Sequence, residues 1–197
     1  MEKVTLLGTK TKPPPEDETS SLLCLEPALL EAAHKDPAAF SALYRHYVAP
    51  VYRYLYKWVG NDAEAEDLTS QVFTEVLEGL AHYRKRGNFN AWIFTIARNK
   101  AIASYRRQRR NLPLEDAEEI PGTTEDALEH MVQGEQMAQM ATLFSRLEEN
   151  QRDLLRLRFT ASLSYADIGS LLGRSEAAVK MAVIRLLRQM HEKWEDK

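Results

Sequence analysis

Apolar residues recur at intervals of three and four along most of the chain, which is the spacing of one face of an α-helix. Asp36 and Pro37 predict the start of a first long helix, because an N-cap residue is followed by proline at the first helical position. Pro50 is expected to kink or restart this helix. Its apolar stripe comprises Phe40, Leu43, Tyr44, Tyr47, Val51, Tyr54, Leu55 and Trp58.

Two more helices are predicted in the first half of the chain. Gly60 and Asn61 indicate a turn, after which Asp62 is expected to cap a helix that ends near residue 80. Residues 82–90 are interpreted as a loop, and Asn90 is expected to cap a helix that ends near residue 109. The apolar stripes comprise Leu68, Val72, Phe73, Val76, Leu77 and Leu80, and then Trp92, Ile93, Ile96, Ala97 and Ile102. No stretch has the alternation of a strand, so the pattern predicts an all-α fold.

Residues 148–194 contain the most specific local pattern. Ser164 and Asp167 have the spacing of a capping box, and Gly173 suits the left-handed position that ends a short helix. Ser175 can then cap a longer basic helix, and this order is typical of a helix-turn-helix. The positions expected to be buried are Leu154, Leu155, Leu157, Phe159, Ile168, Leu171, Leu172, Val179, Val183, Ile184, Leu187 and Met190.

The outward face of that longer helix carries the candidate residues for duplex DNA. Residues early in a recognition helix enter the major groove, while later cations meet phosphates. The candidates are Arg174, Ser175, Lys180, Arg185 and Arg188. The alternative is an ordinary helical hairpin with a solvated basic face.

Charge divides the chain more sharply than its net value of -3 suggests. Residues 84–110 carry nine basic and no acidic side chains, whereas residues 111–135 carry eight acidic and no basic ones. The first segment suits a polyanion and the second would repel one. Together with the prolines, this predicts a disordered leader over 1–26, a helical domain over 27–110, an acidic flexible linker over 111–135 and a second helical domain over 136–197.

Aromatic residues are interleaved with the cations of the basic segment, a mixture that suits an opened DNA strand. Trp92 lies on the apolar stripe and is expected in the core, whereas Tyr83 and Phe89 flank the loop and are favoured for contact with bases. Because no acid interrupts the run, its cations are expected to face a partner. The candidates are Tyr83, Arg84, Lys85, Arg86, Asn88, Phe89, Arg98, Asn99, Lys100 and Arg106.

Several classes of function are disfavoured by what the sequence lacks. No apolar run approaches the roughly 18 residues of a membrane span, and the first ten residues do not resemble a secretory signal, so no membrane insertion and a cytoplasmic location are expected. Cys24 is the only cysteine, which excludes an internal disulfide. The five histidines lack metal-ligand spacing, and no phosphate loop or nucleophile motif is present. We therefore expect no enzyme, no metal and no cofactor.

These residues together resemble the extracytoplasmic-function (ECF) group of the bacterial sigma-70 family. Residues 36–110 are similar to its region 2, through the sequences at 40–44, 65–73 and 90–99. Residues 143–194 are similar to its region 4. In that family a polar or small pair and then arginine often follow the lysine of the recognition helix. Here Met181 and Ala182 follow Lys180, a departure that bears on base reading at those two positions.

The resemblance implies core RNA polymerase, promoter DNA and an anti-sigma factor as partners. It implies that the helix with Glu66, Asp67, Gln71 and Phe73 docks on the clamp helices of the largest subunit. Region 4 would dock on the flap of the second-largest subunit and place the recognition helix at the -35 element. The loop over 83–89 would take a flipped base of the -10 element, and residues 98–100 would line the non-template strand. The acidic linker would run toward the active-site and RNA-exit channels.

Two other binding functions remain open on the sequence alone. A helix-turn-helix repressor or activator that does not bind core polymerase accounts for residues 148–194, but not for the basic segment and the acidic linker. A helical adaptor that binds only proteins is the other, and salt-dependent DNA binding would count against it.

Overall fold

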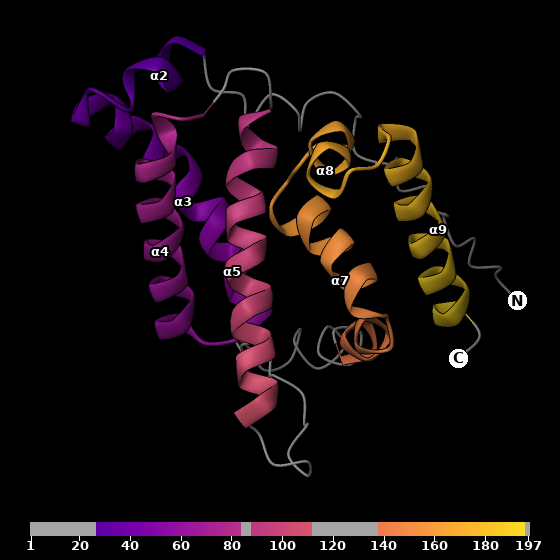
Figure 1. The fold of residues 1–197 in the computed structure, drawn as a ribbon. Helices are drawn as coiled ribbons and strands as arrows, with labels where there is room; N and C mark the ends of the chain where they lie inside the picture. The colour runs from indigo at the N-terminus through magenta and orange to yellow at the C-terminus, as the bar shows by residue number, and fades with distance from the viewer. Residues whose placement is uncertain (1–26, 84–87, 112–137, 196–197) are drawn as a thin grey trace, which may run out of the picture.

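The computed structural model describes residues 27–83, 88–111 and 138–195, and all regular structure in these ranges is helical, as predicted (Figure 1). The predicted leader and all of the predicted linker except Asn111 lie outside the described residues. Residues 138–145 form one helix. The others are α2 (Pro27–Ala32), α3 (Pro37–Val59), α4 (Asp62–Leu80), α5 (Phe89–Asn111), α7 (Glu149–Leu155), the π-helical turn η1 (Arg156–Thr160), α8 (Tyr165–Leu172) and α9 (Glu176–Glu195).

Helices α3, α4 and α5 form the N-terminal unit, in which each helix packs against the other two (Figure 1). Tyr47, Tyr54 and Phe94 are its largest fully buried side chains, and Tyr54 meets Phe94 edge to face with ring centroids 5.7 Å apart. The smaller apolar residues of the predicted stripes fill the space around them, among them Leu43, Val51, Leu55, Val72, Val76 and Ile93.

Local hydrogen bonds fix where these helices begin. The Asp36 side chain accepts from Ala38 N at 2.9 Å, which confirms the predicted cap of α3. The prediction that Asp62 caps α4 is wrong by one residue, because Asn61 has extended backbone and its side chain accepts from Glu64 N. The prediction that Asn90 caps the next helix is also wrong. Helix α5 begins at Phe89, and the Asn88 side chain accepts from Asn90 N.

Pro50 lies inside α3, which continues to Val59 without restarting. A proline in a helix interior removes one backbone hydrogen bond and crowds the preceding turn, at a cost of about 3 kcal/mol. The buried side chains of Tyr47 and Val51 lie on either side of it in the core. Because α3 is continuous through Pro50, a restart is excluded from the two predicted outcomes.

The predicted helix-turn-helix is formed by α8, a turn at Gly173, and α9. Ser164 and Asp167 make both bonds of the capping box, and Gly173 has the left-handed conformation with φ 66°. Gly169 is required for a different reason, since a Cβ atom there would lie 2.7 Å from the carbonyl oxygen of Arg174. The turn therefore depends on one glycine for its backbone conformation and on another for close approach.

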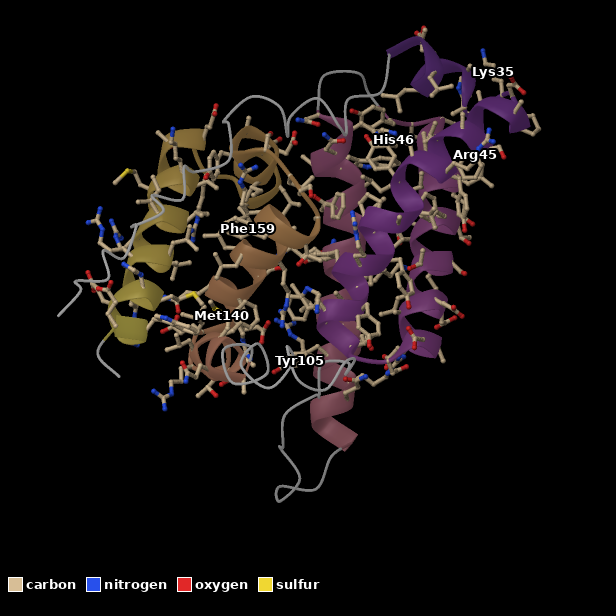
Figure 2. The ribbon with its side chains drawn as sticks, turned by 180° about the vertical axis from the view of Figure 1, so that it is seen from behind. Lys35, Arg45, His46, Tyr105, Met140 and Phe159 are labelled. Atoms are coloured by element: carbon tan, nitrogen blue, oxygen red, sulfur yellow. The ribbon has the colours of Figure 1, made fainter. Side chains whose placement is uncertain are left out.

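Three residues that were predicted to be buried are exposed. Ile184 and Leu187 lie outside the buried stripe of α9, which consists of Val179, Val183 and Leu186. Phe159 is 53% exposed, and Figure 2 shows it on the C-terminal unit. It belongs to η1, whose π-helical hydrogen bonds change the register that an α-helical pattern assumes.

The two helical units pack side by side, with α8 against α5 and η1 against α3 (Figures 1 and 2). The buried core is continuous across this junction, because residues of both units belong to one cluster. None of the helices in the described ranges is long and apolar enough to cross a membrane.

Candidate nucleic-acid and polymerase interfaces

The beginning of α9 presents an exposed polar surface. Residues 173–178 are all exposed, and the Ser175 hydroxyl caps the helix by accepting from Ala178 N at 3.2 Å. Arg174, Arg185 and Arg188 are exposed, as predicted, whereas Lys180 is half-buried. This end of α9 also has the partial positive charge of a helix N-terminus, which favours an anionic partner.

The two residues after Lys180 differ in what they can reach. Ala182 is partly buried and packs against the core, so its side chain faces the inside of the unit. Met181 is 56% exposed on the outer side of the helix. The departure noted in the sequence therefore places only one apolar side chain, that of Met181, on the surface suited to DNA.

The cations of the basic segment do not form one continuous surface. Arg98 Nε lies 2.5 Å from Asp153 Oδ2, Lys100 Nζ lies 2.8 Å from Glu75 Oε2, and an Arg107 nitrogen lies 3.7 Å from Glu64. Asn99 and Arg106 are exposed. The expectation that no acid balances these cations is wrong for these three, because acids distant in sequence come beside them in the fold. Residues 84–86 lie outside the described residues.

A pocket of about 290 Å³ lies between the end of α4 and the beginning of α5. It is lined by Glu75, Gly79, His82, Tyr83, Trp92 and Ile96. Gly79 permits its shape, because a Cβ atom there would lie 2.8 Å from the Trp92 ring. Burial raises the pKa of Tyr83 above its usual value of 10.0.

At this pocket, Phe89 lies in the core and Trp92 lines the pocket, which is the reverse of what the sequence suggested. Phe89 is only 6% exposed and packs against Tyr47, Tyr83 and Trp92, with ring centroids 5.3–5.4 Å apart. Trp92, expected in the core, is partly buried and lines the pocket. Tyr83 and Trp92 are therefore the aromatic residues that a bound group would meet, and Phe89 supports them from behind.

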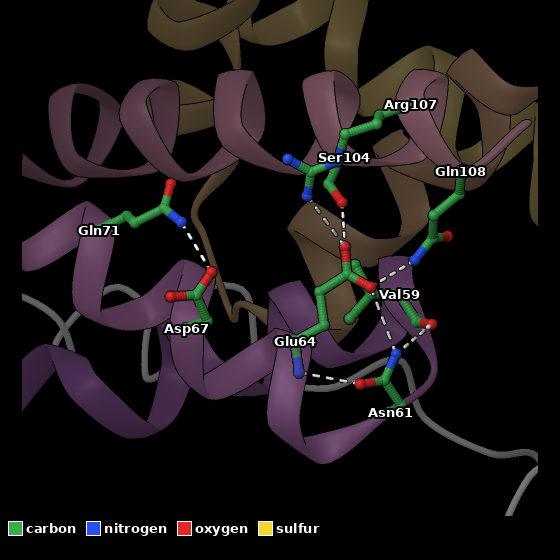
Figure 3. Close-up of polar contacts among 8 residues, drawn as sticks. All are labelled: Val59, Asn61, Glu64, Asp67, Gln71, Ser104, Arg107 and Gln108. Carbon is green, nitrogen blue, oxygen red and sulfur yellow. Dashed lines mark hydrogen bonds and ion pairs between the residues drawn. The ribbon is translucent and has the colours of Figure 1, made fainter. Parts of the chain in front are cut away.

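The outer face of α4 is acidic. Glu66, Asp67 and Gln71 are exposed, and the Gln71 amide donates to Asp67 at 2.8 Å (Figure 3). Phe73, predicted with them, is buried and meets Tyr44 edge to face at 4.6 Å. Phe73 therefore positions the helix, while the three polar residues are available to a partner.

Glu64 has a structural role that separates it from its exposed neighbours. Its carboxylate accepts hydrogen bonds from Ser104, Gln108 and Asn61, and it pairs with Arg107 (Figure 3). These contacts join the first turn of α4 to the last turns of α5. Glu64 is thus occupied within the unit, whereas Glu66 and Asp67 project outward.

Sequence reasoning missed the residues that join the two units. Asp153, 2% exposed, accepts from the Tyr54 hydroxyl at 2.7 Å and pairs with Arg98. Burial, and then the charge of Asp153, hold the pKa of Tyr54 well above its usual value of 10.0. The sequence around Asp153 does not distinguish it from an acidic residue on the exposed face of a helix, because its partners Tyr54 and Arg98 both come from the other unit.

A second group of contacts closes the same junction. Asp167, the N3 residue of the α8 capping box, also accepts from the side chains of Asn88 and Asn90, the latter at 3.2 Å. The Arg156 guanidinium lies 4.4 Å from the Trp58 ring centroid and pairs with Glu149 at 2.6 Å. The junction is therefore held by charged and polar groups as well as by apolar packing.

The described residues offer no group of three or more histidine, cysteine or acidic side chains that could hold a metal ion. The first helical unit has a pocket, cations and an acidic outer face, and the second contains a helix-turn-helix. This combination is typical of two-domain helical transcription factors that bind DNA. The Sigma-70 region 2 model matches residues 43–111, and the Sigma-70 region 4 model matches residues 137–190. The chain belongs to the ECF group of the sigma-70 family of RNA polymerase sigma factors.

Curated relatives extend this similarity over most of the chain. The chain is 34% identical over 169 residues to the ECF RNA polymerase sigma factor BldN of Streptomyces coelicolor. This match covers 82% of this chain and 63% of BldN. The chain is 31% identical over 163 residues to the ECF RNA polymerase sigma factor RpoE of Cereibacter sphaeroides. This match covers 80% of this chain and 89% of RpoE. The chain thus spans less than two thirds of BldN but most of RpoE.

Two solved structures share the fold. CnrH in complex with the cytosolic domain of CnrY has a TM-score of 0.62 at 17% identity, covering 91% of this chain and 99% of that one. The sigma factor RpoE in complex with the anti-sigma factor NepR from Bartonella quintana has a TM-score of 0.58 at 19% identity. This match covers 79% of this chain and 96% of that one. At these identities the likeness concerns the fold alone.

Proposed function

We propose that this chain is an alternative sigma factor that binds core RNA polymerase, recognises the -10 and -35 promoter elements and initiates DNA-templated transcription. One observation carries the proposal: a single chain has two separate surfaces that are suited to DNA. These are the pocket and basic helix of the first unit and the exposed beginning of α9 in the second. A duplex-binding regulator needs only the second. The chemistry of RNA synthesis is that of the polymerase, so this chain acts as an initiation factor in the cytoplasm.

At the -10 element, the pocket beside Tyr83 and Trp92 would receive one base flipped out of the opened strand. Its volume of about 290 Å³ suits a single planar base, and aromatic faces stack on bases of any kind. The cations Arg84, Lys85 and Arg86 directly follow Tyr83 in the sequence. Asn99 and Arg106, both exposed on α5, would follow the strand away from the pocket.

At the -35 element, α9 would enter the major groove by its N-terminal end. Arg174 and Ser175 are placed to reach base edges, and the later residues Arg185 and Arg188 are placed for phosphates. Met181 adds an exposed apolar side chain that can contact a thymine methyl group.

Protein partners would use other surfaces. The acidic face with Glu66, Asp67 and Gln71 suits the clamp helices of the largest subunit, and region 4 would dock on the flap of the second-largest subunit. The sigma factor RpoE of Bartonella quintana is bound to the anti-sigma factor NepR, which agrees with an anti-sigma factor as a third partner of this chain. The proposal includes a stress-responsive function for the chain. That partner would keep the chain from polymerase until a signal releases it.

The test is run-off transcription from host genomic DNA fragments with purified core polymerase, with and without this chain. Specific transcripts that require both components support the proposal. The alternative is a helix-turn-helix repressor or activator that does not bind core polymerase, and a pull-down with core separates the two. An absence of core binding together with footprints on duplex DNA would favour the alternative.

A further inference from the structure

The pocket between α4 and α5 ends at an ion pair. On α5, Trp92, Ile96 and Lys100 recur every four residues and therefore share one face of the helix. Trp92 and Ile96 line the pocket, and Lys100 follows one turn beyond them. Lys100 Nζ lies 2.8 Å from Oε2 of Glu75, a pocket residue of α4, the helix that packs against α5 (Figure 1). The proposed function gives this pair no role.

Glu75 differs from the other residues that line the pocket in the hydrogen bonds that it can make. A carboxylate can only accept them, whereas the Tyr83 hydroxyl and the His82 ring can each donate or accept, and the Trp92 indole can only donate. The two other lining residues have no polar side-chain atoms. Lys100 binds one oxygen of Glu75, and within the described residues no contact uses the other oxygen. That oxygen is therefore open to a donor on a bound group.

The four bases differ in what they present to a carboxylate. Stacking on Trp92 does not separate them, because every base has an aromatic face. Adenine, cytosine and guanine each carry an exocyclic amino group, which donates hydrogen bonds. Thymine carries carbonyl oxygens instead, and its N–H group lies between two of them. A thymine edge would therefore set an oxygen against the carboxylate of Glu75 and leave that carboxylate without a donor.

We propose that Glu75 selects the base that this pocket receives. Its carboxylate accepts a hydrogen bond from an exocyclic amino group, so adenine, cytosine or guanine is bound and thymine is rejected. Lys100 is a positioning residue, which holds the carboxylate in place and offsets its charge beside the phosphates of the strand. This inference rests on the proposed function, in which the pocket receives a base of the -10 element, and it adds the class of base.

The ion pair is open to water, so its loss should alter base preference rather than folding. The side chain of Glu75 is 50% exposed and that of Lys100 is 31% exposed. Ion pairs that are exposed in this way contribute little to stability. A change in base preference on substitution of Glu75 would therefore report on the pocket and not on unfolding.

Glu75→Gln is the primary variant, because it keeps the size of the side chain and replaces a group that only accepts. The amide that it introduces can also donate to a carbonyl oxygen, so thymine is no longer rejected. Glu78→Gln is the matched control. It removes one exposed negative charge from the same helix, three residues away, at a position that does not line the pocket.

The measurement is the affinity of the full chain, bound to core polymerase, for promoter DNA that is single-stranded across the -10 element. Promoters are first mapped by run-off transcription, and each position of the non-template -10 strand is then varied. The decisive bases are thymine and 5-methylcytosine, which share a ring size and a methyl group and differ in the exocyclic amino group. Adenine and purine, which lacks only the amino group of adenine, form a second pair.

At one position of the strand, we expect the wild type to bind 5-methylcytosine at least about fivefold more tightly than thymine, and adenine more tightly than purine. Glu75→Gln should bring both ratios close to one, and Glu78→Gln should retain them. The role of Glu75 is overturned if the wild type favours the amino base at no position, if Glu75→Gln keeps the wild-type ratios, or if Glu78→Gln loses them as well.

Run-off transcription separates this inference from the proposed function. A wild-type chain that supports no specific transcript with core polymerase refutes the sigma-factor proposal itself. Specific transcripts, together with equal affinities for thymine and 5-methylcytosine at every -10 position, refute the role of Glu75 alone.

Discussion

The hydroxyl of Tyr54 donates a hydrogen bond of 2.7 Å to the carboxylate of Asp153, although the two residues are 99 positions apart. Both side chains are buried, and they belong to different helical units. This bond couples the core of region 2 to region 4. Its consequences can be measured without reference to promoter DNA.

Tyr54→Phe should destabilise the folded chain by about 1.5–3 kcal/mol, the usual contribution of a hydrogen bond to a charged group. The ring would still pack on Phe94, so little apolar contact is lost. The free energy of urea unfolding measures the effect. Tyr56→Phe is the control, because its hydroxyl makes no hydrogen bond within the described part of the chain. Equal losses in both variants would contradict a special role for the bond to Asp153.

The same bond predicts how stability depends on alkaline pH. Burial and Asp153 raise the pKa of Tyr54 well above 10.0, so the folded state binds this proton more tightly than the unfolded state does. The stabilisation is therefore complete below about pH 10 and is lost as pH rises from there through the folded-state pKa. Urea unfolding in a pH series should decline more steeply for the wild type than for Tyr54→Phe. Parallel curves would show that Tyr54 does not titrate as expected.

Much of the fold was predictable because its signals are local. The Asp36 cap, the capping box of Ser164 and Asp167, and the left-handed Gly173 each depend on residues within a single turn. The short α8 explains one error, because a helix of eight residues covers only the stripe with Val179, Val183 and Leu186 and leaves Ile184 and Leu187 outside. Helical periodicity alone cannot show how wide the covering partner is.

The site was less predictable, since its geometry arises from contacts distant in sequence. Arg98 and Asp153 are 55 positions apart, so the basic run of α5 gave no sign that this cation is paired. The roles of Phe89 and Trp92 depended on where α5 begins. Because it starts at Phe89, that ring turns into the aromatic cluster and Trp92 reaches the pocket.

Gly79→Ala should damage the pocket that we propose receives a base. The new Cβ atom would lie 2.8 Å from Trp92 Cζ2, so the ring must move at a cost of about 1–3 kcal/mol. Permanganate reactivity of unpaired thymines should show slower promoter opening, while duplex -35 binding is retained. Glu78→Ala, on the adjoining exposed position, is the control. A pocket that does not bind a base would give normal opening in both variants.

Substitutions of Glu64 and Glu66 should affect different properties, stability and polymerase binding, although both residues lie near the start of α4. Glu64→Gln weakens contacts to Ser104, Gln108 and Arg107, so it should lower the free energy of unfolding by about 1.5–3 kcal/mol. Glu66→Gln should leave unfolding unchanged and weaken core polymerase binding by about 1 kcal/mol or more. Urea unfolding and a core-binding titration measure the two effects. If Glu66→Gln binds core as the wild type does, the acidic face is not the docking surface.

The two DNA surfaces should respond separately to substitution. Arg174→Ala, at the exposed beginning of α9, should cost about 1–3 kcal/mol on duplex -35 DNA if it reads a base, and less if it meets only phosphate. Asn99→Ala, exposed on α5, should instead weaken capture of single-stranded -10 DNA and leave duplex binding nearly intact. Each holoenzyme is titrated with both templates, so each variant serves as the control for the other. The asymmetry is expected because α5 and α9 belong to different units. The proposed function assigns these two helices to different forms of DNA. Equal losses on both templates for both variants would mean that the two surfaces act as one continuous site.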